Sequence, residues 1–317
     1  MNPIISVVIC THNRAEYLRK SLRSVVQQSF PKDKYEILVI DNASTDTTKE
    51  IIELESEKSN KIKYIYEPIL GLSQARNTGW LYSNGDYVAY LDDDAIPDKY
   101  WLVNIYEFIK DYPNANVVGG AVQPIWPYKP PSWLNKEISK YLSVIQYEGD
   151  KHGFILDFPN QYIGGGNTTY SRSILKEMNG FKPHLGRKGN ILLSGEETEL
   201  NYRIQKDNYP IWFCPKAIIY HHIPPKRCSK EYFRSISYWS GRTKALVDFE
   251  VNQKNYKIII IRRILSRFSK NLCGSIIKSI LVRKNLFEFE INLLENIGYL
   301  CQGTLILVKG SKLNTLY

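Results

Sequence analysis

The sequence predicts an α/β fold in which a mainly parallel sheet is covered by helices on both faces. Strand and helix signals alternate through residues 4–122, which is typical of successive strand–helix–strand units. The strand segments are continuous apolar runs rich in branched residues, as expected when both faces of a strand are buried. The 317-residue chain is 43% hydrophobic with a mean hydropathy of −0.32, which indicates a globular, water-soluble composition.

Each element of this alternation is expected from its own pattern. Runs such as "IISVVIC" and "YEILVID" have the length and composition of buried strands. We expect strands at residues 4–10, 35–41, 62–67, 86–91 and 115–122. The segments between them repeat their apolar residues with a helical period, and we expect helices at residues 15–28, 45–58, 73–83 and 99–112.

The alternation stops at residues 123–162. The stretch 124–134 contains four prolines and two tryptophans, so it cannot form a regular element. It suits either a lid or sugar-stacking wall, or a surface loop that buries its own aromatic rings. Regular signals resume at residues 164–181 and in a helical segment at 196–208.

Charge and cysteine content narrow the class of protein. A formal net charge of +10 suits an anionic ligand or an anionic surface. The five cysteines are scattered and form no metal-binding or disulfide spacing, so a reducing compartment is expected. We find no signal peptide and no segment approaching the ~20 apolar residues of a membrane span. These features together predict a cytoplasmic protein.

Three consecutive carboxylates end one of the predicted strands. The apolar run 87–91 leads directly into Asp92, Asp93 and Asp94, which repel one another unless a cation lies between them. A solvated acidic turn and a divalent-cation site both fit this stretch on its own. The strands that lead into Thr11 and Asp41 end at the same carboxyl edge of a parallel sheet, where such sheets bind ligands. The shared edge favours the metal site.

Five segments then occur in order and at suitable spacing: "SVVICTHNRAEYLRKSLRSVVQQSF", "EILVIDNASTDTT", "GLSQARNTGW", "YVAYLDDDAIPD" and "GEETEL". Together they resemble the family 2 glycosyltransferases of the GT-A fold, over roughly residues 4–245. The resemblance implies a Rossmann-like, mainly parallel sheet and inverting transfer from a nucleotide-diphosphate sugar, with Mn²⁺ or Mg²⁺ as cofactor. We therefore expect a catalytic domain at 1–245 and a basic helical extension at 246–317.

The resemblance also implies roles for residues that match its motifs. It places Asp41 at the nucleotide base, Asp92 at the ribose and metal, and Asp94 on the metal, with UDP-sugar as the leading donor. His221 is the expected third metal ligand, with His222 as its substitute. The remaining residues expected at the nucleotide sugar are Thr11, Asn13, Arg76, Asp93 and, beside the glycines 164–166, Asn167.

The candidate base lies in "GEETEL". The family usually has Glu-Asp here, so the resemblance implies Glu197 as the base, with Glu196 as its substitute. A carboxylate at this place would take the proton from the acceptor hydroxyl. The same residues also fit a capping box, in which Glu197 reaches back to the start of its helix. Both interpretations are consistent with the local sequence.

The residues after Val251 carry eleven Lys and Arg against three Glu. They resemble an interfacial amphipathic helix attracted to anionic lipid, or a helical pair packed on the catalytic domain. We expect a saccharide or lipid-linked acceptor, peripheral contact with an anionic membrane, and no nucleic acid. The competing functions are a nucleotide-sugar-binding protein without catalysis and, less favoured, a nucleotidyltransferase, which would want a glycine-rich loop after the first strand.

Overall fold

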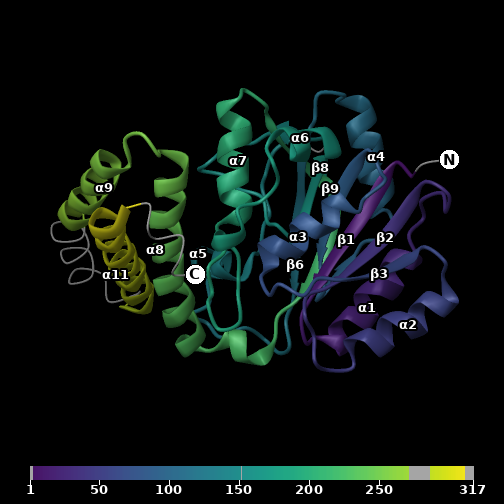
Figure 1. Ribbon diagram of the computed structural model, residues 1–317. Helices are drawn as coiled ribbons and strands as arrows, with labels where there is room; N and C mark the ends of the chain where they lie inside the picture. The colour runs from purple at the N-terminus through teal and green to yellow at the C-terminus, as the bar shows by residue number, and fades with distance from the viewer. Residues whose placement is uncertain (1–2, 151, 271–285, 311–317) are drawn as a thin grey trace. The chain divides into compact units, whose positions relative to one another are not determined.

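The computed structural model describes residues 3–150, 152–270 and 286–310 (Figure 1). These residues form two compact units, and each unit takes more than one stretch of the chain. The first unit comprises Met1–Ile125, Ser143–Pro183 and Leu200–His222, and the second comprises Trp126–Leu142, His184–Glu199 and Ile223–Tyr317. The predicted boundary at residue 245 falls inside a long helix, Lys230–Val251. The division into a catalytic domain and a helical extension at this residue stays a prediction.

The first unit is built on a nine-stranded sheet of mixed direction, in the order β3-β2-β1-β4-β8-β6-β9-β5, with β7 paired to β9. The expected α/β class is confirmed. The strands are β1 (Ile5–Thr11), β2 (Tyr35–Asp41), β3 (Ile62–Tyr66), β4 (Tyr87–Asp92), β5 (Ala95–Pro97), β6 (Val117–Ile125), β7 (Phe154–Ile155), β8 (Asn167–Ser171) and β9 (Ile211–His222).

The N-terminal half of this sheet is parallel, as the alternating pattern predicts. Strands β3, β2, β1 and β4 all run in one direction. Every residue of β2 is buried, which requires cover on both faces of the sheet. The register places Thr11 opposite Asp41 and Cys10 opposite Asp92. The polar residues at the ends of three strands therefore do share one edge.

Helices cover this parallel half. In α1 the buried residues Leu18, Leu22 and Val25 recur at helical spacing and give the helix its apolar face. In α3, Gly79 lies so close to Val8 of β1 that a Cβ there would be 2.4 Å from a valine methyl group. The helices are α1 (Ala15–Val26), α2 (Thr48–Lys58), α3 (Leu72–Leu81), α4 (Trp101–Asp111) and α6 (Arg172–Glu177).

The other half of the sheet differs from the sequence-based expectation. Strand β8 runs antiparallel to both β4 and β6, so the sheet reverses direction there. Strand β6 continues to Ile125, beyond the point where the sequence pattern fails, because β9 pairs with it in parallel as far as His222. The segment 164–181 thus contributes one short strand and one short helix, rather than a further parallel unit.

The second unit is mainly helical. Its three long helices, α8 (Lys230–Val251), α9 (Tyr256–Lys270) and α11 (Leu286–Lys309), pack side by side (green to yellow in Figure 1). A separate apolar core, which includes Leu246, Phe249, Ile260 and Tyr299, holds them together. The shorter elements are α5 (Lys136–Ser139), η1 (Lys140–Leu142), η2 (Pro183–Leu185) and η3 (Pro225–Cys228), and α7 (Glu196–Lys206) starts in this unit.

Part of the predicted irregular insertion belongs to this second core. The ring of Trp133 packs edge-to-face on Phe233 and on Phe287, with ring centroids 5.5 and 5.0 Å apart. The indole therefore anchors residues 126–142 to α8 and α11. For Trp133 this packing favours the prediction of a surface loop that buries its own aromatic rings. It argues against a role for this tryptophan in stacking on a sugar.

Helix α11 is more apolar than the sequence pattern suggested. Among the described residues it alone has the length and hydropathy of a membrane-crossing helix, although 33% of its most apolar 18-residue window is buried in the structure. The expectation that no segment reaches this level is wrong by this measure. Polar residues such as Asn292, Asn296 and Gln302 interrupt the apolar run. The mean hydropathy of the helix nevertheless stays in the range of a membrane-crossing segment. Residues 271–285 of the predicted basic helical stretch lie outside the described residues.

Helices α8 and α11 touch backbone to backbone through two glycines. A Cβ on Gly241 would lie 1.8 Å from the carbonyl oxygen of Glu295, and one on Gly298 would lie 2.0 Å from that of Tyr238. These helices can approach this closely only where both side chains are absent. By contrast, a Cβ on Gly303 would meet only side-chain atoms, the nearest being a methyl carbon of Ile260 at 3.0 Å.

Replacing Gly298 and Gly303 of α11 by alanine should therefore change the stability of the protein by different amounts. We expect Gly298→Ala to lower the free energy of unfolding by about 1–3 kcal/mol, because the helices must move apart. Gly303→Ala should change it by less than about 1 kcal/mol, because alanine favours a helix and the isoleucine can shift. Thermal and denaturant unfolding of both variants measures the difference. Equal losses would contradict the backbone contact.

Candidate functional site

The acidic run lies at the carboxyl edge of the parallel strands. Strand β4 ends at Asp92, and after a two-residue turn the chain enters β5. Strand β5 pairs antiparallel with β9, and this register sets Ala95 opposite His221. The backbone N–H of His222 also donates to the carbonyl oxygen of Asp94 at 2.9 Å. Residues more than a hundred positions apart are thereby held side by side.

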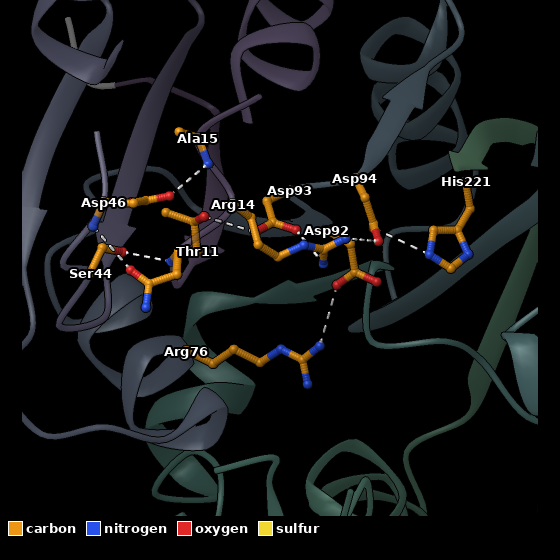
Figure 2. Close-up of polar contacts among 11 residues, drawn as sticks. Thr11, Arg14, Ala15, Ser44, Asp46, Arg76, Asp92, Asp93, Asp94 and His221 are labelled. Atoms are coloured by element: carbon orange, nitrogen blue, oxygen red, sulfur yellow. Dashed lines mark hydrogen bonds and ion pairs between the residues drawn. The ribbon is translucent and has the colours of Figure 1, made fainter. Parts of the chain in front are cut away.

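Three side chains at this place form a group that could hold a metal ion. Ligand atoms of Asp92, Asp94 and His221 all lie within 4.8 Å of one another. His221 Nε2 is 3.2 Å from Asp94 Oδ1, and both side chains are buried (Figure 2). Two carboxylates with one imidazole suit Mn²⁺, and the carboxylates also suit Mg²⁺. The residues present therefore fit the divalent cation that the resemblance implies.

A cation of the chain itself, Arg14, neutralises part of the acidic run. Its Nη1 lies 2.8 Å from Asp93 Oδ1, and its Nη2 donates to Asp94 Oδ2 at 2.5 Å. Thr11 donates from Oγ1 to the other oxygen of Asp93 at 2.8 Å. Burial acts to lower the pKa of Arg14, but the charges of Asp93 and Asp94 outweigh it and raise this pKa. The guanidinium thus stays charged between the two carboxylates.

Arg14 was missed from the sequence. It stands three residues beyond the end of β1, in the same "THNR" segment as the predicted Thr11. The signal that could have found it was the unbalanced charge, because three adjacent carboxylates require a nearby cation. The linked residues Thr11, Asp93, Arg14, Asp94 and His221 form a continuous polar chain along the sheet edge (Figure 2).

Asp93 is the carboxylate that this environment perturbs most clearly. Burial raises its pKa to about 7, and the charge of Asp94 adds to this effect, while Arg14 and the Thr11 hydroxyl oppose it. Its two oxygens are occupied by Arg14 and Thr11. Asp93 therefore orients Arg14, and Asp92 and Asp94 are left as the carboxylates that face His221.

The predicted nucleotide contact Arg76 is also at this edge. Its Nη2 is 3.8 Å from Asp92 Oδ1, and the side chain is buried against the rings of Tyr90 and Phe181. The glycines of "GGGN" explain how the backbone fits here. A Cβ on Gly165 would lie 2.5 Å from the Arg76 guanidinium, and one on Gly166 would lie 2.2 Å from the Asp92 carboxyl carbon. Only glycine allows this approach.

Asp41 lies on the same edge, with its carboxylate held in place. Its Oδ1 accepts from the backbone N–H of Ser44 at 3.1 Å and its Oδ2 accepts from the Tyr64 hydroxyl at 3.0 Å. Burial and this hydrogen bond raise the pKa of Tyr64 to about 12, so the phenol stays protonated as a donor. A carboxylate has about four acceptor positions, so Asp41 can accept further hydrogen bonds.

Two predicted ligand-binding residues support the backbone. Asn13 adopts a φ of 53°, and its Oδ1 accepts from the backbone N–H groups of Thr45 at 2.7 Å and Asp46 at 3.2 Å. This side chain fixes the turn after β2. Asn13 therefore holds the loop beside Asp41, and its place in the nucleotide pocket stays a prediction.

Asn167 also supports the backbone, and its predicted contact with the sugar stays a prediction. The register between β6 and β9 shifts after Gly120, and Asn167 Nδ2 donates to the carbonyl oxygens of Ala121 and Ala217 at 2.9 and 2.8 Å beside this shift. Its Oδ1 accepts from the indole of Trp101 at 2.8 Å. Both Nδ2 and Oδ1 of Asn167 thus form hydrogen bonds in the interior beside the sheet. The sequence alone does not show which strands pair, so these bonds could not be predicted.

The remaining predicted residues have clear positions but no tested role. Glu196 is buried and Glu197 is half-buried in the first turn of α7, within the second unit. Their assignment as base stays a prediction. His222 packs against the ring of Tyr17, with centroids 6.1 Å apart. Burial, together with the nearby charge of Lys20, lowers the pKa of His222 and keeps its imidazole neutral at pH 7.

The fold defines the class of the chain. It is similar to the mannosyltransferase PcManGT from Pyrobaculum calidifontis, whose structure contains GDP-Man and Mn²⁺. That similarity covers 95% of this chain and 88% of that one, with a TM-score of 0.62 and 17% identity, and therefore concerns the fold. The expected GT-A type fold is thus confirmed.

The sequence then gives the family. Residues 6–178 match glycosyl transferase family 2, which is more than half of the chain, and the chain therefore belongs to that family. It is 32% identical to the glycosyltransferase AglE of Haloferax volcanii, over 54% of this chain and 60% of AglE. It is 24% identical to a glucosyl-dolichyl phosphate glucuronosyltransferase of the same organism, over 77% of each chain.

The shifted pKa of Asp93 gives a test of the polar chain. Because its folded pKa of about 7 exceeds the ordinary value near 3.9, the folded state favours the protonated acid. Its contribution to stability is thus full below about pH 4 and is lost as the pH rises towards 7. With chelator present, parent and Asp93→Asn should be compared in urea at several pH values. We expect the parent to lose stability relative to the variant across this range, and a constant difference would contradict the shift.

Proposed function

We propose that this protein is an inverting glycosyltransferase that moves a sugar from a nucleotide-diphosphate donor to an acceptor hydroxyl. The observation that carries the proposal is the group formed by Asp92, Asp94 and His221 at the edge that also holds Asp41 and Arg76. This edge is where α/β sheets bind nucleotides. Family membership supports the reaction class, and the matched relatives carry glycosyltransferase names.

The donor is recognised by charge and by hydrogen bonding. A diphosphate gains negative charge as it leaves, and Arg76 and Arg14 supply fixed positive charge at this edge. Asp92, Asp94 and His221 would hold the divalent cation, which when bound offsets charge on the leaving diphosphate. Asp41 would accept from a ring N–H of the base, which uracil presents at N3 and guanine at N1, and which cytidine lacks. UDP remains the leading nucleotide of the proposal.

The bond changes follow from inversion. A carboxylate takes the proton of the acceptor hydroxyl, and the oxygen attacks the anomeric carbon from the side opposite the diphosphate. The bond between the anomeric carbon and the phosphate oxygen breaks, and its electron pair leaves with the diphosphate. Glu197 is the base of the proposal, and Glu196 is its substitute, because the family resemblance places them in this motif.

The acceptor belongs to cell-surface polysaccharide or glycoconjugate synthesis in this proposal. One relative is named for transfer onto glucosyl-dolichyl phosphate, a saccharide carried on a lipid. A lipid-linked acceptor lies at a membrane surface, so the proposal includes a peripheral position at the cytoplasmic face of a membrane. A saccharide acceptor without lipid would need no such position.

The metal assignment predicts a loss of nucleotide binding in Asp94→Asn. Asp94 joins His221 and Arg14, so removing its charge should weaken Mn²⁺-dependent UDP binding by at least about tenfold, or GDP binding if that is the donor. Calorimetric titration with and without Mn²⁺ measures this. Asp86→Asn, an exposed aspartate just before the start of β4, is the matched control. Similar affinities for both variants and the parent would refute the metal site.

The base assignment predicts a different pattern. Glu197→Gln keeps the size of the side chain but cannot take a proton, so kcat should fall by about 10²-fold or more while donor affinity stays near that of the parent. Glu196→Gln should do less, since adjacent helical residues point about 100° apart. The measurement is sugar transfer under saturating donor and acceptor, together with the unfolding midpoint of each variant.

The same pair of variants separates the alternatives. Loss of activity in Glu196→Gln alone would make that residue the base. Parent rates in both variants would remove the glutamates from the reaction. Donor binding with no transfer or hydrolysis in the parent, across a broad panel of acceptors, would favour a nucleotide-sugar-binding protein without catalysis.

A further inference from the structure

Helix α9 directs its arginines toward the other helices of its unit. Arg263 Nη1 lies 2.7 Å from Asp248 Oδ1 on α8. Arg267 Nη1 donates to Asn296 Oδ1 on α11 at 2.6 Å, and its guanidinium lies 4.3 Å from the ring centre of Tyr299. Together with the buried Ile260, these contacts define the packed side of α9.

The opposite side of α9 is apolar and exposed. Ile258, Ile261 and Leu265 are 56%, 46% and 63% exposed. At about 100° per residue they fall within an arc of about 60°, so they form one stripe along the helix. A surface helix of a soluble protein normally turns its polar face outward. Here large aliphatic side chains lie outside, and ion-paired arginines lie against the neighbouring helices.

Helix α11 repeats this arrangement. Its buried residues, including Gly298 and Gln302, face α8 and α9. Four of its five exposed large aliphatic residues again lie within an arc of about 60° on the other side, and the fifth, Leu305, lies outside that arc. We define the apolar stripes as these exposed residues of the two helices: Ile258, Ile261 and Leu265 on α9, and Leu286, Leu293, Ile297 and Val308 on α11.

The charge beside the stripe of α9 is positive, whereas Glu290 lies within the arc of the α11 stripe and is paired with Arg234 of α8. Lys257 and Arg262 are exposed on α9 and flank its stripe on either side at helical spacing. The sequence from 252 to 287 contains nine Lys and Arg and no Asp or Glu. Aliphatic residues bordered by cations match the boundary between the anionic headgroups and the acyl chains of a lipid layer.

The same charge argues against a second copy of this chain as the partner. In a symmetric dimer the same patch appears on both subunits, so Lys257 and Arg262 would meet their own copies. Like charges placed together at an interface are unfavourable. An anionic lipid surface supplies the opposite charge and an apolar layer together.

We propose that the outer sides of α9 and α11 form a docking surface for an anionic phospholipid membrane. Ile258, Ile261 and Leu265 enter the boundary between headgroups and acyl chains, while Lys257 and Arg262 contact lipid phosphates. The stripe of α11 extends the apolar area. This surface includes none of the residues proposed for the transfer reaction, so the two proposals can fail separately.

The test is co-sedimentation of the full chain with vesicles. Neutral vesicles contain phosphatidylcholine alone, and anionic vesicles contain about one-third phosphatidylglycerol in phosphatidylcholine. We expect binding to the anionic vesicles that falls as sodium chloride is raised, because salt screens the contact with the headgroups. Equal binding to both kinds of vesicle would overturn the proposal.

Two substitutions test the stripe and its charge against matched controls. Leu265→Ser should weaken binding to anionic vesicles about fivefold or more, because it removes an inserted side chain. Leu81→Ser in the first unit, where Leu81 is also 63% exposed, should leave it unchanged. Lys257→Gln should weaken binding about fivefold. The same change at the exposed Lys110 on α4 should have no effect.

Other outcomes would point elsewhere. If Leu265→Ser and Lys257→Gln bind vesicles as the parent does, the surface is not the membrane contact. If light scattering without lipid shows a parent dimer that Leu265→Ser converts to monomer, the stripe is a protein interface. Unfolding midpoints establish that the variants are folded, and Lys257→Gln keeps the test decisive should Leu265→Ser be unstable.

Discussion

Repulsion among three adjacent carboxylates is the constraint around which the first unit is organised. Asp92, Asp93 and Asp94 follow one another at the end of β4, and each is directed to a different partner. Asp92 lies near Arg76, Asp93 contacts Arg14 and Thr11, and Asp94 is shared by Arg14 and His221. The partners come from β1 and the loop that follows it, from α3 and from β9, so the charge of one turn links distant segments of the chain. The close approach of Gly166 to Asp92 completes the same arrangement.

Much of this arrangement could be predicted from the sequence, and the missing parts have a common cause. The parallel strands were predictable because continuous apolar runs alternate with amphipathic helices, and their shared edge followed from direction alone. The hydrogen bonds that Asn13 and Asn167 make within the chain could not be predicted, because the local sequence does not show which distant groups a polar side chain will meet. The bulge between β6 and β9 that Asn167 serves depends on pairing between distant segments. Arg14 was missed for the same reason: its partners lie about 80 positions away.

The direction of the strands was harder to predict in the second half of the sheet. Strand β8 is a short polar segment, "NTTYS", and its antiparallel pairing with β4 and β6 leaves no local mark. Strand β9 carries both histidines to the edge because it runs parallel to β6 over its whole length. The grouping of Asp92, Asp94 and His221 therefore depends on a strand order that sequence patterns do not encode, even though each of the three residues could be named as a candidate from the sequence.

The acidic run at the end of β4 and the buried carboxylates of the helical unit differ in charge balance. In the second unit Asp248 and Glu295 are met by Arg263, Lys244 and Arg267, so cations outnumber acids. Lys244 and its neighbours lower the pKa of Glu295 against the effect of burial, whereas burial keeps the pKa of Asp248 raised despite Arg263. In the acidic run three carboxylates face only two guanidinium groups, those of Arg14 and Arg76. A negative excess of this kind is relieved either by a proton or by a bound cation. Because two of the three carboxylates also lie beside an imidazole, a divalent cation can satisfy them together, whereas a proton can satisfy only one.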